Sequence, residues 1–370
     1  MGCKGCKMEQ LSIERKEIKK TNKNKTKKIR RFSWDFNLYS EKGMACAFAI
    51  IIIIAGLSIY HLTYGEHSGK TTITVYASPA FRLLIDNGLG PAFENKTNIH
   101  VVGSYLGGGE QYYKIKITNQ TDCDLFLHAA PLYIEKGYAE GLFISYKTQH
   151  EDEINDSLKS REVTYNNING RIWYAVAWTP LVEIYSIKNY VQAPDIVRNK
   201  NVSFGLSHPI LANNGIYVAL MLESFPEEVT RDIESRCKYQ PANAQATIDG
   251  VCTGKYDIAF GYEGTVIEYK KKGYPIDSDV TLVDGKKYCT PVLVSAGIVK
   301  KGKTDLALKF IEWMLSEEGQ SVFQKFYYRP TCAEYSGDGV KITNDVKFVN
   351  YNWSKTEEID SILRKHVLGG

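Results

Sequence analysis

The chain has 370 residues, enough for two compact lobes that each bury a core. Its hydrophobic (44%) and charged (24%) fractions are ordinary for a globular protein and exclude wholesale disorder. The net charge of +4 is unevenly distributed, because residues 1–43 hold 13 Lys and Arg against 5 Asp and Glu, which leaves the remainder acidic. A nucleic-acid-binding protein is expected to carry its basic surface on the folded domain, so we expect no nucleic-acid partner.

An apolar segment, residues 44–62, follows the basic tail and reads MACAFAIIIIIAGLSIYHL, without Asp, Glu, Lys or Arg. Its length is close to the roughly 20 residues that cross a bilayer core, and the basic residues before it favour a cytoplasmic N-terminus. We therefore predict a basic cytoplasmic tail (1–43), a transmembrane signal anchor (44–62), a linker (63–70) and a folded part outside the cell. A cleaved signal peptide is the rival interpretation, although no A-x-A site follows, and a buried core helix is the third.

Beyond residue 70 the pattern alternates between strands and helices, which predicts a mainly parallel α/β sheet. The polar stretch 148–169 is interpreted as a surface excursion, and the last strong helices are expected at 305–315 and 317–326. Expected strands cover 71–78, 99–103, 124–128, 171–180, 202–206, 257–260 and 288–299, and expected helices include 79–96, 111–117, 133–141, one opening near 213, and 266–272. The aromatic residues Trp173, Tyr174 and Trp178 fit the core of a crossing strand or the lining of a cleft.

No motif demands catalysis. The run GEHSGKTT at 65–72 has only three residues between its glycines and precedes a strand, whereas a phosphate-binding loop needs four and follows one. The histidines show no metal-ligand spacing, and Cys3 and Cys6 form a lone C-x-x-C. We expect no enzyme, no cofactor and no metal site. Five cysteines follow the apolar segment, an odd number whose pairing the sequence leaves open: Cys123, Cys237, Cys252, Cys289 and Cys332.

Five loops at the ends of predicted strands have ligand-binding character. In open α/β sheets, ligands bind beyond the carboxyl ends of strands, where helix N-termini present free N–H groups. Ordinary turn chemistry explains any single loop of this kind, but five in one chain favour a shared binding site. The candidate ligand-binding residues are Ser78 and Pro79; Gly107, Gly108, Gly109 and Glu110; Ala129 and Ala130; Asn213, Asn214 and Gly215; and Tyr262 and Glu263.

Three segments resemble the type II periplasmic-binding-protein superfamily, in the branch that serves ferric, thiamine, phosphonate and molybdate-like importers. They read DLFLHAAPLYIEKGYAEGLF (124–143), GKYDIAFGYEGTVIEYKKKGYPI (254–276) and TDLALKFIEWMLSEEGQSVFQKFYYRP (304–330), and the third is the most specific. Ferric-binding members of the superfamily carry adjacent tyrosines after the G-x-x-D strand. This chain has only Tyr262 there, which puts iron in doubt.

The resemblance implies an α/β fold with two lobes, residues 71–170 with 290–370 and residues 171–289, preceded here by one transmembrane helix. It implies a substrate-binding subunit of an ABC importer, which delivers a small ligand to the permease without making or breaking bonds. The signal anchor predicted above would attach this subunit to the cell membrane by a single pass. An oxyanion such as molybdate, tungstate or a phosphonate suits the helix-start loops, although Glu110 and Glu263 would repel one unless they point away. A cationic or zwitterionic organic ligand such as thiamine, ferric ion, and a sensor ectodomain remain alternatives.

Overall fold

The computed structural model describes residues 71–119, 122–162, 171–187, 195, 199–349 and 351–368. Residues 1–68 and 69–370 form two separate units, and the described residues all belong to the second. The predicted cytoplasmic tail, signal anchor and linker therefore lie outside the described residues. Within them, no helix is both long and apolar enough to cross a bilayer.

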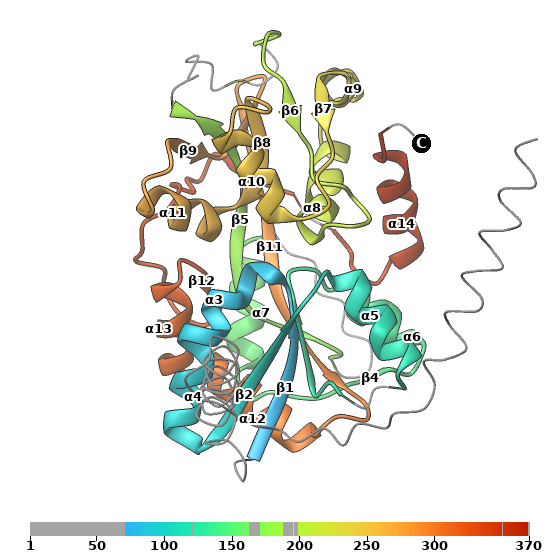
Figure 1. Cartoon of the computed structure of the whole chain (residues 1–370), viewed down its shortest axis with the longest axis vertical. Coiled ribbons are helices and arrows are strands. Elements are labelled where there is room, and N and C mark those ends of the chain that lie inside the picture. The colour runs from blue at the N-terminus through green and yellow to red at the C-terminus, as the bar shows by residue number, and fades with distance from the viewer. Residues whose placement is uncertain are drawn as a thin grey trace, which may run out of the picture. The chain divides into compact units, whose positions relative to one another are not determined.

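Two long buried strands run through both lobes of this unit and join them (Figure 1). These are β5 (Tyr174–Ser186) and β11 (Lys286–Val299), which pair antiparallel along most of their length. One end of β11 pairs with β3 of the first lobe, and one end of β5 pairs with β8 of the second. The continuous strand order β2-β1-β3-β11-β5-β8-β6-β7 therefore carries the sheet from one lobe into the other.

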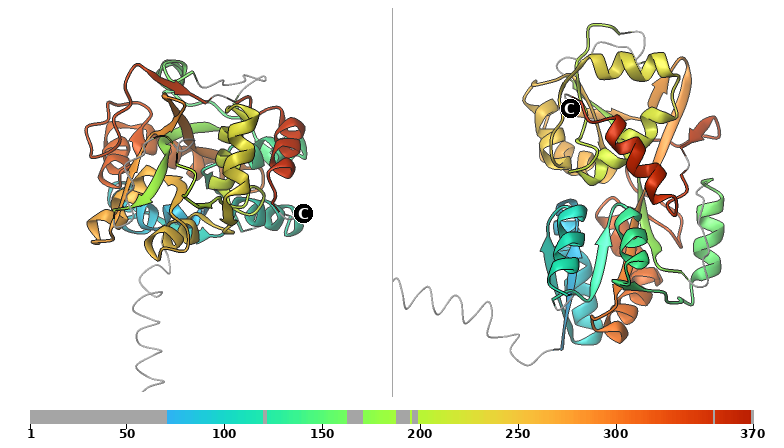
Figure 2. Two further views of the ribbon diagram at one scale, coloured as in Figure 1. Left: turned by 90° about the horizontal axis from the view of Figure 1, so that it is seen from above. Right: turned by 90° about the vertical axis from the view of Figure 1, so that its right-hand side faces the viewer.

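Strands β2, β1 and β3 of the first lobe pair parallel, as the alternation of elements predicts, and helices pack against them (Figures 1 and 2). The sheet as a whole is mixed and not mainly parallel, because β5 and β11 pair antiparallel with each other and with their neighbours β8 and β3. Every residue of β3, at the middle of the sheet, is buried, whereas β2 at its edge is only partly buried. The elements of the first lobe are β1 (Thr71–Ala77), η2 (Pro79–Phe81), α3 (Arg82–Leu84), η3 (Ile85–Leu89), α4 (Gly90–Thr97), β2 (Ile99–Tyr105), α5 (Gly108–Ile117), β3 (Leu125–His128), α6 (Leu132–Ala139), β4 (Phe143–Ile144), α7 (Glu151–Lys159), α12 (Thr304–Leu315), α13 (Glu317–Lys325) and β12 (Arg329–Pro330).

The second lobe repeats the arrangement on a smaller sheet, in which β6 pairs parallel with both β7 and β8. Its most apolar helix is α8, in which every residue from Asn213 to Leu222 is buried. The elements are β6 (Phe204–Gly205), α8 (Asn213–Glu223), α9 (Glu227–Ser235), β7 (Cys237–Tyr239), α10 (Ala244–Cys252), β8 (Ile258–Tyr262), α11 (Glu263–Lys271), β9 (Ile276–Asp279), β10 (Thr281–Val283), β13 (Val346–Phe348) and α14 (Thr356–Lys365).

Two segments differ from the sequence expectation. The stretch interpreted as a surface excursion contains α7, because Ile154 and Leu158 lie four residues apart and bury one face of a helix. The sequence predicts residues 290–370 in the first lobe. The C-terminal part of this range packs mainly on the second lobe, since β13 pairs with the start of β11 and α14 packs against α8, although α14 also contacts α6 of the first lobe.

The aromatic residues of the crossing strand form core, as one of the two interpretations held. Trp173, Tyr174 and Trp178 are each at most 4% exposed, and none of them lines the cavity described below. Among the described residues all five cysteines are free, so the structure contains none of the disulfides that the sequence left open.

Candidate functional site

A cavity of about 1320 Å³ lies between the two lobes, and residues of both lobes line it. From the first lobe come the start of η2, the end of β2, the start of α5, and α6. From the second come the starts of α8 and α10, the end of β8, and one face of α11. Strand ends and helix starts therefore converge on this cavity, as expected for an open α/β sheet.

Seven of the thirteen candidate residues line the cavity and six do not. The lining residues are Ser78, Pro79, Gly107, Gly109, Glu110, Asn213 and Tyr262. The residues outside the lining are Gly108, Ala129, Ala130, Asn214, Gly215 and Glu263. Four of the five loops thus supply at least one lining residue, and the Ala129–Ala130 loop supplies none. That these lining residues contact a ligand stays a prediction.

The start of α5 is fastened across the cleft to the start of α8. The backbone N–H of Gly108 donates to Oδ1 of Asn213 at 3.3 Å. A β-carbon at Gly108 would lie 2.6 Å from that same oxygen and 2.9 Å from the ring of Tyr133, so this position requires glycine. Gly108 therefore helps to hold the lobes together at the floor of the cavity, which explains why it is buried beside it.

Asn213 also reaches a buried histidine at the end of β3. Its Nδ2 lies 2.9 Å from Nδ1 of His128, and Nε2 of His128 bonds to Oε1 of Gln111. Because Nε2 of Gln111 donates to the carbonyl of Ser104 at 2.6 Å, its Oε1 is the acceptor, and His128 is neutral with its proton on Nε2. Burial lowers the pKa of His128 to about 3. These uncharged groups therefore form a chain of hydrogen bonds that connects the two lobes.

The neighbouring Asn214 turns into the second lobe. Its Nδ2 donates to Oγ of Ser207 at 2.5 Å and to the carbonyl of Phe260 at 3.4 Å. Gly215 packs so closely that an added β-carbon would lie 2.2 Å from the carbonyl oxygen of His208. These two residues fix the position of α8 within its own lobe, and the cavity receives only the first residue of this loop.

Glu263 is fully buried and paired, so its charge does not face the cavity. Its carboxylate accepts from Nε and Nη2 of Arg329 at 2.9 and 2.8 Å, and from the backbone N–H of Val340 at 2.6 Å. Arg329 follows α13 of the first lobe, and α11 belongs to the second, so this ion pair also crosses between lobes. Of the two glutamates that could repel an anion, only the exposed Glu110 lies at the cavity.

Tyr262 ends β8 at the cavity, and its side chain is 1% exposed. Its hydroxyl has no hydrogen-bond partner among the described residues. Burial raises the pKa of this phenol above its ordinary value, so the hydroxyl stays protonated at neutral pH and can donate a hydrogen bond.

Most of the cavity's side chains could not be predicted from the sequence, because they stand in segments that carry no recognisable motif. Five further tyrosines line the cavity: Tyr105, Tyr113, Tyr133, Tyr269 and Tyr274. Its charged residues, besides Glu110, are Arg82, Lys136, Glu268, Lys272, Asp360 and Arg364. Burial raises the pKa of the Glu268 carboxyl group above its ordinary value. The cavity thus combines apolar rings with both signs of charge.

One group of metal-ligating side chains lies apart from the cavity lining. Side-chain ligand atoms of His150, Glu153 and Cys332 all lie within 4.8 Å of one another. The set of nitrogen, oxygen and sulfur donors suits a metal such as zinc. Nδ1 of His150 already bonds to Glu153 at 3.0 Å, and that carboxylate side chain is 61% exposed. This group could not be predicted from the sequence, because Cys332 is distant along the chain from His150 and Glu153.

Two α/β lobes joined by crossing strands, with a cavity between them, define a protein that binds small solutes. The chain belongs to the bacterial extracellular solute-binding protein family, whose model matches residues 73–329. The family's members are solute-binding proteins and not enzymes, and the binding domain of this chain is accordingly extracytoplasmic. No curated protein matches the sequence.

Solved structures share this fold at low sequence identity. The periplasmic binding protein AfuA from Actinobacillus pleuropneumoniae, with fructose-6-phosphate bound, has a TM-score of 0.67 at 14% identity, covering 82% of this chain and 100% of that one. Iron-bound HitA from Pseudomonas aeruginosa has a TM-score of 0.58 at 17% identity, covering 80% and 100%. A periplasmic thiamin-binding protein has a TM-score of 0.63 at 15% identity, covering 80% and 96%. The fold resemblance to the type II binding proteins of ABC importers is thereby confirmed.

Proposed function

We propose that this chain captures a small organic oxyanion, of the phosphonate class, in the cavity between its lobes. The observation that carries the proposal is the composition of the cavity wall. Helix starts from both lobes supply backbone N–H groups, and tyrosines supply apolar faces. N–H groups at helix starts suit an anionic head, and aromatic rings suit an organic body.

Cavity size favours an organic ligand over a bare inorganic oxyanion. Drug-sized ligands occupy clefts of roughly 300–1,000 Å³, so a cavity of about 1320 Å³ has room for an organic group beside an anionic head. Glu110 and Glu268 add carboxylates that an amine on the ligand would pair with. A zwitterionic phosphonate therefore uses more of the wall than either a simple anion or a simple cation.

The importer role needs a permease and a membrane, and we propose that residues 44–62 anchor the chain with the basic tail inside the cell. The run of 19 residues without charge and the basic flank support this topology. A reporter enzyme fused before Met44 is expected to be active only in the cytoplasm. A reporter that is active outside the cell would contradict the anchor.

A thermal-shift screen of the full chain in detergent tests the ligand class. The panel contains phosphate, molybdate, tungstate, ferric citrate, thiamine, and methyl-, aminoethyl- and phenylphosphonate. A ligand present at a hundred times its dissociation constant stabilises the fold by about 2.7 kcal/mol. We expect the phosphonates with an organic group to raise the melting temperature most. A response to molybdate or tungstate alone would contradict the organic ligand but keep the binding function.

A matched pair of tyrosines controls the screen. Tyr113 lines the cavity and is 59% exposed, whereas Tyr239 is 48% exposed and lies outside the lining. Tyr113→Ala is expected to reduce the shift caused by phenylphosphonate, because one apolar face is lost, and Tyr239→Ala to leave it unchanged. Equal responses from the two variants would place the ligand elsewhere.

A further inference from the structure

The C-terminal helix α14 lies outside the part of the chain that matches the family. The family model ends at residue 329, and α14 begins at Thr356. Nevertheless Asp360, Leu363 and Arg364 of this helix line the cavity between the lobes. One wall of the binding site therefore comes from residues beyond the part of the chain that the family model matches.

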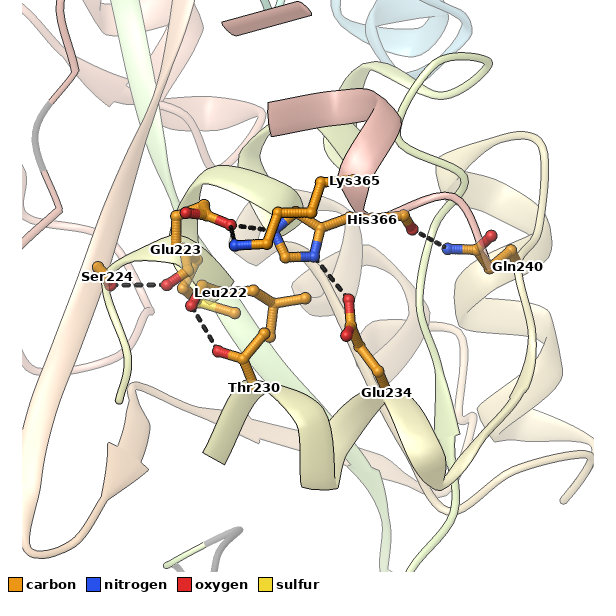
Figure 3. A network of polar contacts seen from close by, with 9 residues as sticks. Leu222, Glu223, Ser224, Thr230, Glu234, Gln240, Lys365 and His366 are labelled. Carbon is orange, nitrogen blue, oxygen red and sulfur yellow. Dashed lines mark hydrogen bonds and ion pairs between the residues drawn. The ribbon is translucent and has the colours of Figure 1, made fainter. Parts of the chain in front are cut away.

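Buried polar contacts fasten the end of α14 to the second lobe (Figure 3). The ring of His366 is 3% exposed, and its Nε2 and Nδ1 lie 2.8 and 2.6 Å from carboxylate oxygens of Glu223 and Glu234. Lys365 also bonds to Glu223, at the end of α8. Gln240 completes the attachment by donating to the carbonyl of His366 at 2.8 Å and accepting from the N–H of Leu368 at 2.9 Å.

The middle of α14 reaches the first lobe through one ion pair. Nζ of Lys136, on α6, lies 2.6 Å from Oδ1 of Asp360, and the two side chains are 25% and 30% exposed. Figure 1 shows α14 directly above α5 and α6. Both members of the pair line the cavity, so the contact spans its rim. A helix anchored in one lobe and touching the other beside the ligand site is placed to influence both closure and ligand choice.

We infer that α14 is a clasp on the binding cleft: Leu363 and Arg364 help to select the ligand, and the Lys136–Asp360 pair favours the closed arrangement of the lobes. The ligand-selecting part rests on the proposed function, whereas the closure part does not. A partly exposed ion pair contributes little by itself, and a change of about two- to fivefold in the closed–open equilibrium is expected from its loss.

Amide hydrogen exchange of the full chain, without ligand, tests the closure part. The Gly108 amide bonds to Asn213 across the cleft, so peptides that contain it report separation of the lobes. D360K is expected to speed exchange there severalfold, and the charge-swapped double variant K136E/D360K to restore it. D345N is the control, because Asp345 pairs with Lys287 at 3.0 Å, away from the cavity lining. Unchanged exchange in D360K, or no restoration by the swap, would overturn the clasp.

Thermal shifts with methyl- and phenylphosphonate test the ligand-selecting part. The thermal shifts give an apparent affinity for each of the two phosphonates. L363A and R364A are expected to change the ratio of these two affinities by at least about threefold, and D345N is expected to leave the ratio unchanged. Wild-type responses with unaltered ratios in both variants would overturn this part. If the wild-type chain responds to neither phosphonate, both the proposed ligand class and the ligand-selecting part are overturned. The exchange experiment still tests the closure part in that case.

Discussion

The starts of α5 and α11 are alike in sequence and different in structure. Each follows a strand that ends at the cavity, each carries a glycine, and each has a glutamate in its first turn. At α5 the glutamate, Glu110, is exposed at the cavity, and uncharged groups around Gly108 make the bond to the other lobe. At α11 the glutamate itself, Glu263, makes that bond by pairing with Arg329. Because Arg329 pairs with Glu263 across the cleft, only Glu110 remains available to a ligand.

The largest expected effect follows from breaking the charged connection. Arg329→Leu leaves Glu263 buried without its partner, which is expected to lower the free energy of unfolding by about 3–5 kcal/mol. Urea unfolding of the full chain measures this loss. Lys96→Ala is the control, because Lys96 and Glu318 form an ion pair on the surface and its loss should cost less than about 1 kcal/mol. A loss equally small in Arg329→Leu would contradict the difference drawn between the two helix starts.

The uncharged connection is expected to fail on acidification. His128 has a pKa of about 3 in the fold against an ordinary value of 6.5, so the unfolded state binds the additional proton. Stability is therefore lost as the pH falls from about 6.5 towards 3, by up to about 1.4 kcal/mol per unit. His128→Gln is expected to show a shallower decline between pH 7 and pH 5 in the same urea experiment. Parallel profiles for the two proteins would show that His128 does not titrate between the states.

Crowding at the same connection gives an intermediate effect. Gly108→Ala forces a methyl group against Asn213 and Tyr133, and about 1–3 kcal/mol of stability should be lost. Gly107→Ala places its methyl group no closer than 3.5 Å to its nearest neighbour, so it should change stability by less than about 0.5 kcal/mol. Thermal unfolding of both variants measures the contrast, and equal melting temperatures would remove the argument that Gly108 is required.

The smallest effect on stability is expected at the exposed glutamate. Glu110→Gln should stay within about 0.5 kcal/mol of the wild type, because the carboxylate is exposed and has no buried partner. The thermal shift caused by aminoethylphosphonate should nevertheless fall, while that caused by methylphosphonate should hold or rise. Equal changes with both ligands would show that Glu110 does not contact the amine.

Hydrophobic patterning was sufficient to predict the two crossing strands and most of the strands and helices of the first lobe, but in the second lobe it predicted only β6, β8, α8 and α11. The strand-end loops followed from it, because strand direction in a parallel sheet brings those loops to one edge. Helix α7 was missed, since only Ile154 and Leu158 carry its period within a polar stretch. Helix α14 had a clearer signal, with Ile359, Ile362 and Leu363 on one face, and its role at the cavity could not be predicted without knowing the lobe on which it packs.

The different structural roles of similar residues in these loops could not be predicted from the sequence. Asn213 and Asn214 are adjacent and chemically identical, yet one bonds across the cleft and the other within its lobe. Glu263 differs from Glu110 through its partners Arg329 and Val340, which lie 66 and 77 residues beyond it along the chain. Such distinctions arise from contacts between distant segments, and local pattern carries no information about them.

Hydrogen exchange of the full chain with and without phenylphosphonate tests most directly whether the ligand binds between the lobes. We expect slower exchange in peptides from both walls of the cavity, covering residues 105–113 and 262–274, together with the start of α8. Protection confined to one lobe, or to segments outside the cavity lining, would contradict the claim that the two lobes close on the ligand.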